Sequence, residues 1–214
     1  MDITHQSKTW NEEFGTEYLD RNMYNPKELN TLYKERYGLT KDELNDQFLK
    51  DIPKDIKILE IGTNIGNQLL HLQSQGYTNL YGIELQDRAI DYAKHRANNL
   101  HIIKGDALDV PFKDNYFDLV FTNGVLIHIA PENIKIAMNE MCRVSKKYIW
   151  GLEYFADEYT ELDYHGQKNL MWKADFCKIF LDSNTNVTVL KEQKYNYLEN
   201  DTLIDQMYLL QKTK

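Results

Sequence analysis

The sequence predicts an α/β protein with a Rossmann-like, seven-stranded, mostly parallel sheet, an antiparallel last strand and an N-terminal helical cap. Two observations lead to this class. From residue 54 onward, short β-rich runs alternate with amphipathic helical stretches, which is typical of parallel βαβ units. The first run ends in a glycine-bearing turn, Gly62 to Gly66, of the kind that joins a strand to a helix at a ligand site.

Length and charge fit one continuous domain with a small partner. The chain has 214 residues, of which 42% are hydrophobic, enough to fill a single core. Its formal net charge of -8 argues against general affinity for nucleic acid or an anionic membrane. No stretch approaches the ~20 apolar residues that a membrane span requires. We therefore expect a cytoplasmic protein, monomeric or homodimeric, that acts on a small molecule.

Residues 1–52 are expected to form the helical cap, and residues 53–214 the core with the elements of the site. Within the cap, Thr40 followed by Glu43 forms a capping-box pattern, and Leu44, Phe48 and Leu49 then recur at helical spacing. This pattern predicts a helix that begins after Thr40.

Runs rich in aliphatic and aromatic residues predict the strands of the core. They cover residues 56–61, 80–83, 100–104, 117–121, 148–152, 187–194 and 207–211. Amphipathic stretches predict helices at residues 66–75, 87–98, 131–144 and 174–181. Pro131 suits a first helical position. The last two strands are close enough in sequence to pair antiparallel.

The turn after the first strand allows backbone N–H groups to approach a ligand, because glycine has no Cβ to block them. A dinucleotide fingerprint, G-x-G-x-x-G, would need glycine where this chain has Asn64 and Asn67. The turn therefore does not indicate a diphosphate. Taken alone, it fits a cofactor site or an ordinary strand-to-helix turn.

Two acids at the ends of the next strands favour the cofactor site. Glu84 ends the second strand 22 residues after Gly62, where a carboxylate can accept hydrogen bonds from both ribose hydroxyls. Asp106 ends the third strand, where it can accept a hydrogen bond from an adenine amino group. Each acid alone also fits a solvated strand end. The predicted cofactor-binding residues are Glu60, Gly62, Asn64, Gly66, Glu84, Leu85, Asp106, Ala107 and Asn123.

Residues 54–152 resemble the class I methyltransferases that use S-adenosylmethionine (SAM). The resemblance rests on the ordered motifs Glu60-Ile61-Gly62-x-Asn64-x-Gly66, Gly82-Ile83-Glu84, Gly105-Asp106-Ala107 and Phe117-Asp118-Leu119-Val120. It implies SAM as the cofactor. The late pair of strands agrees with it, since dinucleotide-binding Rossmann sheets end differently.

The flanking segments are similar to the methylases associated with pseudaminic acid biosynthesis. The similar segments are Trp10-Asn11-Glu12-Glu13-Phe14-Gly15, Asp20-Arg21-Asn22, Gly124 to Ile129, Lys147-Tyr148-Ile149, Glu153-Tyr154, Tyr164-x-Gly166 and Lys173-x-Asp175-Phe176. This resemblance implies an enzyme of bacterial surface-glycan or capsule biosynthesis, acting on a sugar or a phosphoramidate-type group. The family carries arginine where this chain has His165 and Ala174, so an arginine pair that binds phosphate or carboxylate is not implied here.

Methyl transfer from a sulfonium depends mainly on positioning, and it needs a base only when the acceptor is an unionised hydroxyl or a protonated amine. His128 follows the fourth strand and is the first candidate for that base. Glu153 and Tyr154, at the end of the fifth strand, are the next candidates. A helix-capping or core role is the alternative for these residues.

Residues of both flanks are predicted to bind the acceptor. In the cap, Arg21 lies near Tyr18 and Asn22, and its guanidinium suits a carboxylate or phosphate. A salt bridge that holds the cap down is the alternative. Tyr164 and His165 are expected in the loop before the helix at 174–181. The acids of residues 157–163 are expected in a solvated loop, and no metal site is predicted.

Together these residues predict a SAM-dependent methyltransferase that modifies an oxygen or nitrogen of a small polar metabolite. One alternative is a SAM-binding protein without catalytic activity. A second alternative is a nicotinamide-dependent oxidoreductase, which Asn64, Asn67 and the late pair of strands disfavour.

Overall fold

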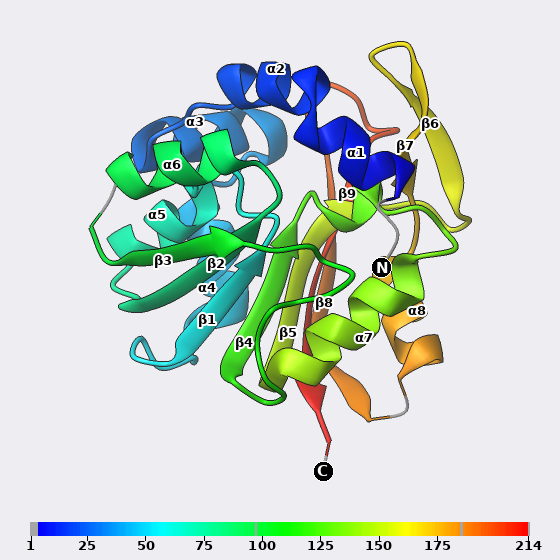
Figure 1. Cartoon of the computed structure of the whole chain (residues 1–214). Helices are drawn as coiled ribbons and strands as arrows, with labels where there is room; N and C mark the ends of the chain where they lie inside the picture. Colours follow the sequence, from blue (N-terminus) through cyan, green and yellow to red (C-terminus); the bar gives the residue numbers. More distant parts are fainter. Residues whose placement is uncertain (1–3, 97, 185, 214) are drawn as a thin grey trace.

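The computed structural model describes residues 4–96, 98–184 and 186–213 (Figure 1). The helices are α1 (His5–Asn11), α2 (Glu13–Arg21), α3 (Pro26–Tyr37), α4 (Lys41–Leu49), α5 (Asn67–Ser74), α6 (Asp87–Arg96), the 3-10 helix η1 (Leu126–His128), α7 (Ile134–Val144) and α8 (Phe176–Ser183). The strands are β1 (Lys57–Ile61), β2 (Asn79–Glu84), β3 (Leu100–Lys104), β4 (Phe117–Asn123), β5 (Ser145–Tyr154), β6 (Thr160–Tyr164), β7 (Gln167–Lys173), β8 (Val187–Asn196) and β9 (Ile204–Lys212).

A seven-stranded sheet with the order β3-β2-β1-β4-β5-β9-β8 forms the centre of the fold. Strands β1 to β5 are parallel, and β9 runs antiparallel to both of its neighbours, β5 and β8. The predicted mostly parallel sheet with an antiparallel last strand is confirmed. The strand order reverses between β1 and β4, and open α/β sheets bind ligands at such a switch point.

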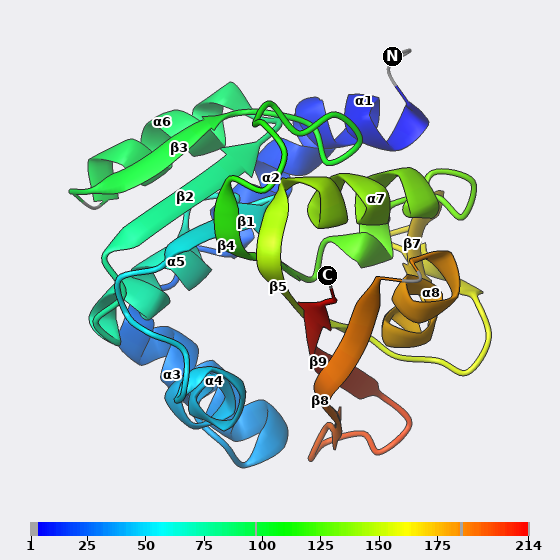
Figure 2. The same ribbon diagram turned by 90° about the horizontal axis from the view of Figure 1, so that it is seen from below.

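Helices cover both faces of the sheet, so the central strands are apolar on both sides. Helices α3 to α6 pack on one face, and α7 and α8 pack on the other (Figure 2). Helices α1 and α2 lie across the carboxyl ends of the parallel strands (Figure 1). No helix in the described part of the chain is long and apolar enough to cross a membrane.

The capping box at the start of α4 is confirmed. The hydroxyl of Thr40 accepts a hydrogen bond from the N–H of Glu43 at 3.2 Å, and the Glu43 carboxylate accepts one from the N–H of Thr40 at 2.7 Å. A second capping box, of Asn25 and Glu28, starts α3. These two helices place Tyr33 and Leu44 in the same core as Ile58 of β1.

The expectation of a loop around Tyr164 and His165 is wrong, because this region forms the β6–β7 hairpin. Tyr164 ends β6, and His165 lies in the turn with φ 54°. The sequence signal for the hairpin is weak, because β6 is a short alternation of polar and apolar residues and the apolar part of β7 is only Leu170-Met171-Trp172. Helix α7 begins at Ile134, after a turn that contains Pro131, and not at Pro131 itself. Residue 97, in the predicted helix 87–98, lies outside the described residues.

Candidate active site

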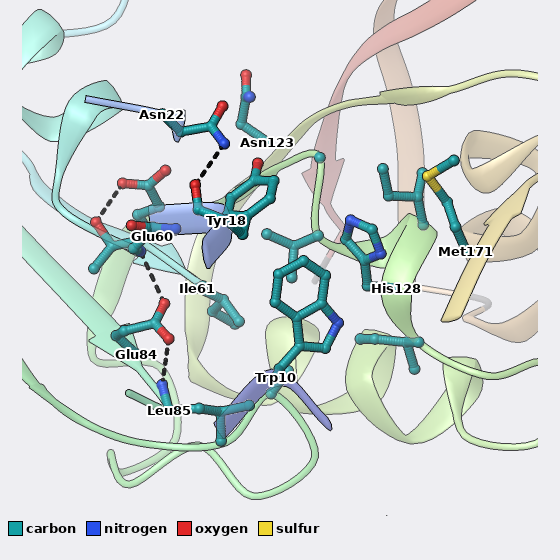
Figure 3. Close-up of a pocket in the computed structure, with 18 of the residues that line it drawn as sticks. Trp10, Tyr18, Asn22, Glu60, Ile61, Glu84, Leu85, Asn123, His128 and Met171 are labelled. Carbon is teal, nitrogen blue, oxygen red and sulfur yellow. Dashed lines mark hydrogen bonds between the residues drawn. The ribbon is translucent and has the colours of Figure 1, made fainter. Parts of the chain in front are cut away.

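A cavity of about 490 Å³ lies at the carboxyl ends of the parallel strands, at the switch point of the sheet. Helices α1 to α3 form one side of it, and η1 with the β6–β7 hairpin forms the other. All of the predicted site residues line this cavity except Gly66 and Glu153. Figure 3 shows Glu84 and His128 on opposite sides of Trp10.

Backbone hydrogen bonds hold the turn after β1 against β2. The N–H groups of Gly62 and Thr63 both donate to the carbonyl oxygen of Ile83, at 2.9 and 3.0 Å. Gly62 has φ 69°, and a Cβ there would lie 2.8 Å from a methyl group of Val125, so the position requires glycine. Gly66 caps α5 with φ 78° and helps to start the helix.

The carboxylate of Glu84 is buried beside this turn, at the end of β2 (Figure 3). One oxygen accepts a hydrogen bond from the N–H of Asn64 at 2.8 Å, and the other accepts from the N–H groups of Leu85 and Gln86 at 2.8 and 3.0 Å. Burial raises the pKa of Glu84, against the opposing effect of these backbone donors. A carboxylate has about four acceptor positions, so Glu84 can still accept a hydrogen bond from a ligand.

The acid at the end of β3 contacts the cap. Asp106 accepts hydrogen bonds from the N–H of Leu108 at 2.9 Å and from the hydroxyl of Ser7 in α1 at 3.1 Å. Ala107 lines the cavity beside it. Ser7 was not predicted as a site residue, because the sequence contains no signal that brings α1 to the end of β3.

Glu60 is buried within β1 and accepts a hydrogen bond from the hydroxyl of Thr63 at 2.7 Å. Burial raises the pKa of Glu60 to about 8. The fully buried Lys41 of α4 opposes this rise, while burial lowers the pKa of Lys41 itself to about 7. Two buried ionisable groups that interact electrostatically therefore lie between the cap and the sheet.

Asn123 ends β4, and its amide oxygen faces the cap. That oxygen accepts hydrogen bonds from the Lys41 ammonium at 3.1 Å and from the Tyr33 hydroxyl at 3.4 Å. Neither donor was predicted from the sequence. A lysine in the polar helix α4 would ordinarily be solvent-exposed, and no motif indicates that α3 and α4 reach the end of β4.

His128, at the end of η1, lies between two aromatic rings. Its ring centroid is 4.5 Å from that of Trp10 and 5.3 Å from that of Tyr164. Nδ1 lies 2.8 Å from the carbonyl oxygen of Leu170, and because a carbonyl only accepts, Nδ1 carries the proton and Nε2 the lone pair. Burial lowers the pKa of His128 to about 4. The imidazole is therefore neutral near pH ~7 and can accept a proton at Nε2.

Glu153 is fully buried and does not reach the cavity. Its carboxylate accepts hydrogen bonds from the N–H groups of Val125 and Ile127, at 3.2 and 3.4 Å. Burial raises its pKa to about 7. Glu153 thus fixes the segment that carries His128, whereas Tyr154, the next residue of β5, lines the cavity.

The predicted acceptor-binding residues lie on two sides of the cavity. On the cap side, the Asn22 amide donates to the carbonyl oxygen of Tyr18 at 2.8 Å, and the Arg21 guanidinium lies 3.7 Å from an exposed glutamate of α2. On the hairpin side, Tyr164 and His165 meet edge to face with ring centroids 4.7 Å apart.

Trp10 connects these two sides. The sequence named it only as part of an N-terminal motif, yet it lines the cavity and its ring centroid lies 5.1 Å from that of Tyr18. Its indole N–H is buried and has no hydrogen-bond partner among the described residues. Such a donor inside a ligand cavity is available to a ligand.

The site fits a cofactor that contains adenosine and an amino acid tail. Asp106 suits an adenine amino group, Glu84 suits ribose hydroxyls, and the turn at Gly62 admits a close backbone approach. Gly124 has φ 67°, and no atom lies within 4 Å of a Cβ placed on it, so the space beside η1 is open. Within the described ranges, no group of three or more His, Cys, Asp or Glu side chains could hold a metal ion.

The fold and the site together define a class of protein, a Rossmann-like domain that binds an adenosine cofactor at the ends of its parallel strands. Residues 59–148 match the sequence profile described as a methyltransferase domain. This match, over part of the chain, supports a SAM-dependent methyltransferase with SAM as the cofactor.

Curated relatives match part of the chain. An uncharacterized protein of Haemophilus influenzae is 31% identical over 101 residues, which cover 44% of this chain and 39% of that protein. A demethylmenaquinone methyltransferase of Staphylococcus haemolyticus is 35% identical over 68 residues, which cover 30% of this chain and 28% of that enzyme. The match thus spans less than half the length of either relative.

A solved structure shows that the fold extends over almost the whole chain. The magnesium protoporphyrin IX methyltransferase of Synechocystis, with bound SAH (S-adenosylhomocysteine), superposes with a TM-score of 0.70 at 11% identity. The superposition covers 97% of this chain and 98% of that enzyme.

Proposed function

We propose that the chain catalyses methyl transfer from SAM to an oxygen or nitrogen of a small polar acceptor. The supporting observation is one continuous cavity that reaches from Glu84 and Asp106, which suit adenosine, to His128 and Tyr154 beside open space at Gly124. Bound SAM supplies an electrophilic methyl group on its sulfonium, and the acceptor supplies the lone pair.

The chain's own residues have three tasks in this proposal. Glu84, Asp106 and the turn at Gly62 hold the cofactor, with Glu60 beside its amino acid end and Asn123 between that end and the acceptor. His128 removes a proton from an acceptor hydroxyl or ammonium through Nε2, since Nδ1 is bound to Leu170. The neutral form of His128 is the one that can do this.

Two residues position His128. Glu153 holds the backbone at Val125 and Ile127, and the carbonyl of Leu170 fixes the imidazole tautomer. Glu153 is therefore proposed as a positioning residue and not as the catalytic base.

The acceptor is proposed to lie between Tyr18, Arg21 and Asn22 of the cap and Tyr164 and His165 of the hairpin. A small polar molecule suits a cavity of about 490 Å³ that is lined by both charged and aromatic residues. The net charge of -8 disfavours nucleic acid as the acceptor. The resemblance of the flanking motifs supports a sugar or phosphoramidate-type group of bacterial surface glycan or capsule, with the reaction in the cytoplasm and a monomer or homodimer as the active form.

Transfer of tritium from methyl-labelled SAM to candidate acceptors tests the proposal. We expect label in a small polar acceptor with the unmodified chain and little label with His128→Ala. If SAM binds and none of a broad panel of surface-glycan precursors is labelled, a SAM-binding protein without catalytic activity becomes the better description.

A further inference from the structure

Hydrogen-bond donors line the cap side of the cavity, away from the adenosine-binding acids. This donor wall consists of Asn123 at the end of β4 with Tyr33 and Arg36 of α3, and Lys41 of α4 lies behind Asn123. Tyr33 and Arg36 are three residues apart on one helix, so they share a face.

The amide orientation of Asn123 is fixed by its neighbours. The amide oxygen faces Lys41, whose Nζ donates to it at 3.1 Å, and the Tyr33 hydroxyl adds a second donor to that oxygen at 3.4 Å. The remaining polar end of this cavity-lining side chain is its NH₂ group, which makes no hydrogen bond within the described part of the chain. Asn123 therefore offers N–H donors to a ligand and no acceptor atom.

Arg36 lines the same side of the cavity without an ion-pair partner. Its guanidinium lies 4.9 Å from the ring centroid of Tyr197, and no carboxylate of the described residues lies within 4.0 Å of it. A half-buried guanidinium is stabilised by an oxyanion that accepts two parallel hydrogen bonds. The Tyr37 hydroxyl accepts a hydrogen bond from this guanidinium, and the other N–H groups of Arg36 are available for a ligand.

Asp205 of β9 interacts electrostatically with Arg36, but its carboxylate is already bound to other donors. Its carboxylate accepts hydrogen bonds from the hydroxyls of Tyr37 and Tyr197. It reduces the positive charge around Arg36, but it does not occupy the guanidinium N–H groups. Burial raises the pKa of Asp205 to about 6, so this opposing charge is weakened at mildly acidic pH.

We propose that Asn123 and Arg36 bind an oxyanion group of the methyl acceptor, either a carboxylate or a phosphate. The inference rests on the proposed methyl transfer and names the chemical class of the acceptor. It also makes Asn123 a specificity determinant, because its NH₂ group attracts an oxygen with free lone pairs and repels an ammonium.

The first experiment titrates the SAH-loaded protein in a calorimeter with inorganic phosphate, acetate and ethanolamine. We expect phosphate or acetate to bind and ethanolamine not to bind. The anion that binds more tightly shows whether the acceptor carries a phosphate or a carboxylate. Arg36→Gln and Asn123→Asp should each weaken anion binding at least about tenfold, which corresponds to the loss of one charged hydrogen bond. Arg36→Lys, which keeps the charge without the fork, should weaken it less.

Lys27→Gln is the matched control, because Lys27 is an exposed cation on the same helix and the substitution removes the same charge. It should leave anion binding unchanged. Circular dichroism of each variant verifies that it is folded. The inference is overturned if the unmodified chain binds no anion. It is also overturned if the folded Arg36→Gln and Arg36→Lys variants bind the anion as tightly as the unmodified chain does.

A second experiment tests whether Arg36 binds the carboxylate of the cofactor instead. SAH is compared with methylthioadenosine, which lacks the amino acid tail. If Arg36→Gln weakens binding of SAH but not of methylthioadenosine, Arg36 belongs to the cofactor site and the inference is wrong. If the unmodified chain does not bind SAH, the proposed function itself is contradicted. This result differs from a failure of the inference, in which SAH binds but the anion does not.

Discussion

The carboxylate of Glu84 accepts a hydrogen bond from the backbone N–H of Asn64 at 2.8 Å, so the end of β2 fixes the turn that follows β1. The other oxygen of this carboxylate accepts from the N–H groups of Leu85 and Gln86. One acid thereby shapes two loops at the edge of the cavity and retains lone pairs on the cavity side.

Glu84→Ala should weaken SAH binding by at least about tenfold, since it removes the charge-assisted hydrogen bond that the remaining acceptor position of the carboxylate makes to the ribose, worth about 1.5–3 kcal/mol. Calorimetry with SAH measures the change. Asp87→Ala is the control, because Asp87 is an exposed acid at the start of α6, three residues away. If a folded Glu84→Ala variant binds SAH as tightly as the unmodified chain does, the proposed role of Glu84 is contradicted.

His128→Asn should lower kcat by about 100-fold or more, which is the usual contribution of a general base. The affinity for SAH should stay unchanged. Asparagine can still donate to the carbonyl of Leu170, so the variant removes the base and keeps the contact. Because burial lowers the pKa of His128 to about 4, the residue stays neutral well below pH ~6.5, its ordinary pKa. The measurement is the pH dependence of kcat. If kcat falls as the pH is lowered through about 6.5 and this fall is absent in His128→Asn, the neutral state assigned to His128 is contradicted.

Glu153→Gln should change how stability depends on pH. Burial raises the pKa of Glu153 to about 7 in the folded state, whereas the unfolded chain has the ordinary value near 4.3. Between these values the folded state binds more protons, so the contribution of Glu153 to stability is complete at low pH and is lost as the pH rises through about 7. Denaturant unfolding from about pH 5 to about pH 8 should show the variant gaining stability relative to the unmodified chain. A difference that does not vary with pH would refute this assignment.

Arg96→Ala should destabilise the protein, since this side chain joins the cap to the core. Its guanidinium donates to the carbonyl oxygens of Tyr24 and Ile65 and to the amide oxygen of Asn67. Loss of these contacts should lower the free energy of unfolding by about 2–4 kcal/mol in urea titrations, given about 1.5–3 kcal/mol for a hydrogen bond to a charged group and partial replacement by water. Arg96→Lys keeps the charge but cannot reach all three acceptors, so it should recover only part of the loss. A change below about 0.5 kcal/mol, typical of a neutral surface position, would show that the contact does not hold the cap.

The fold was predictable from local pattern, because each parallel strand is a short apolar run that ends in a glycine or an acid. Gly62 follows β1 directly, Glu84 is the last residue of β2, and Asp106 comes shortly after β3, so their places at the edge of the sheet follow from the chain order. The contacts made by Ser7, Arg36 and Lys41 were not predictable, since they depend on how the cap helices pack across the sheet. The first half of the β6–β7 hairpin resembles a charged loop in sequence, and the short apolar run Leu170-Met171-Trp172 in the second half does not indicate which segment it pairs with.

The role of Glu153 illustrates the same limit. Its place at the end of β5 suggested a catalytic acid or base beside the cavity. In the structure its side chain turns away from the cavity and accepts hydrogen bonds from the backbone before His128. The direction in which a side chain points at the end of a strand depends on the loop that packs against it. The sequence of the strand alone does not show how that loop packs.

Parallel calorimetric titrations of the unmodified chain with SAM and with NAD⁺ test the central assignment most directly. Asn64 and Asn67 stand where a dinucleotide site would have glycine, and Glu84, Asp106 and the open space at Gly124 suit SAM. We predict saturable heat of binding with SAM and none with NAD⁺. Binding of NAD⁺ without binding of SAM would contradict the assignment of the site and the methyl-transfer function together.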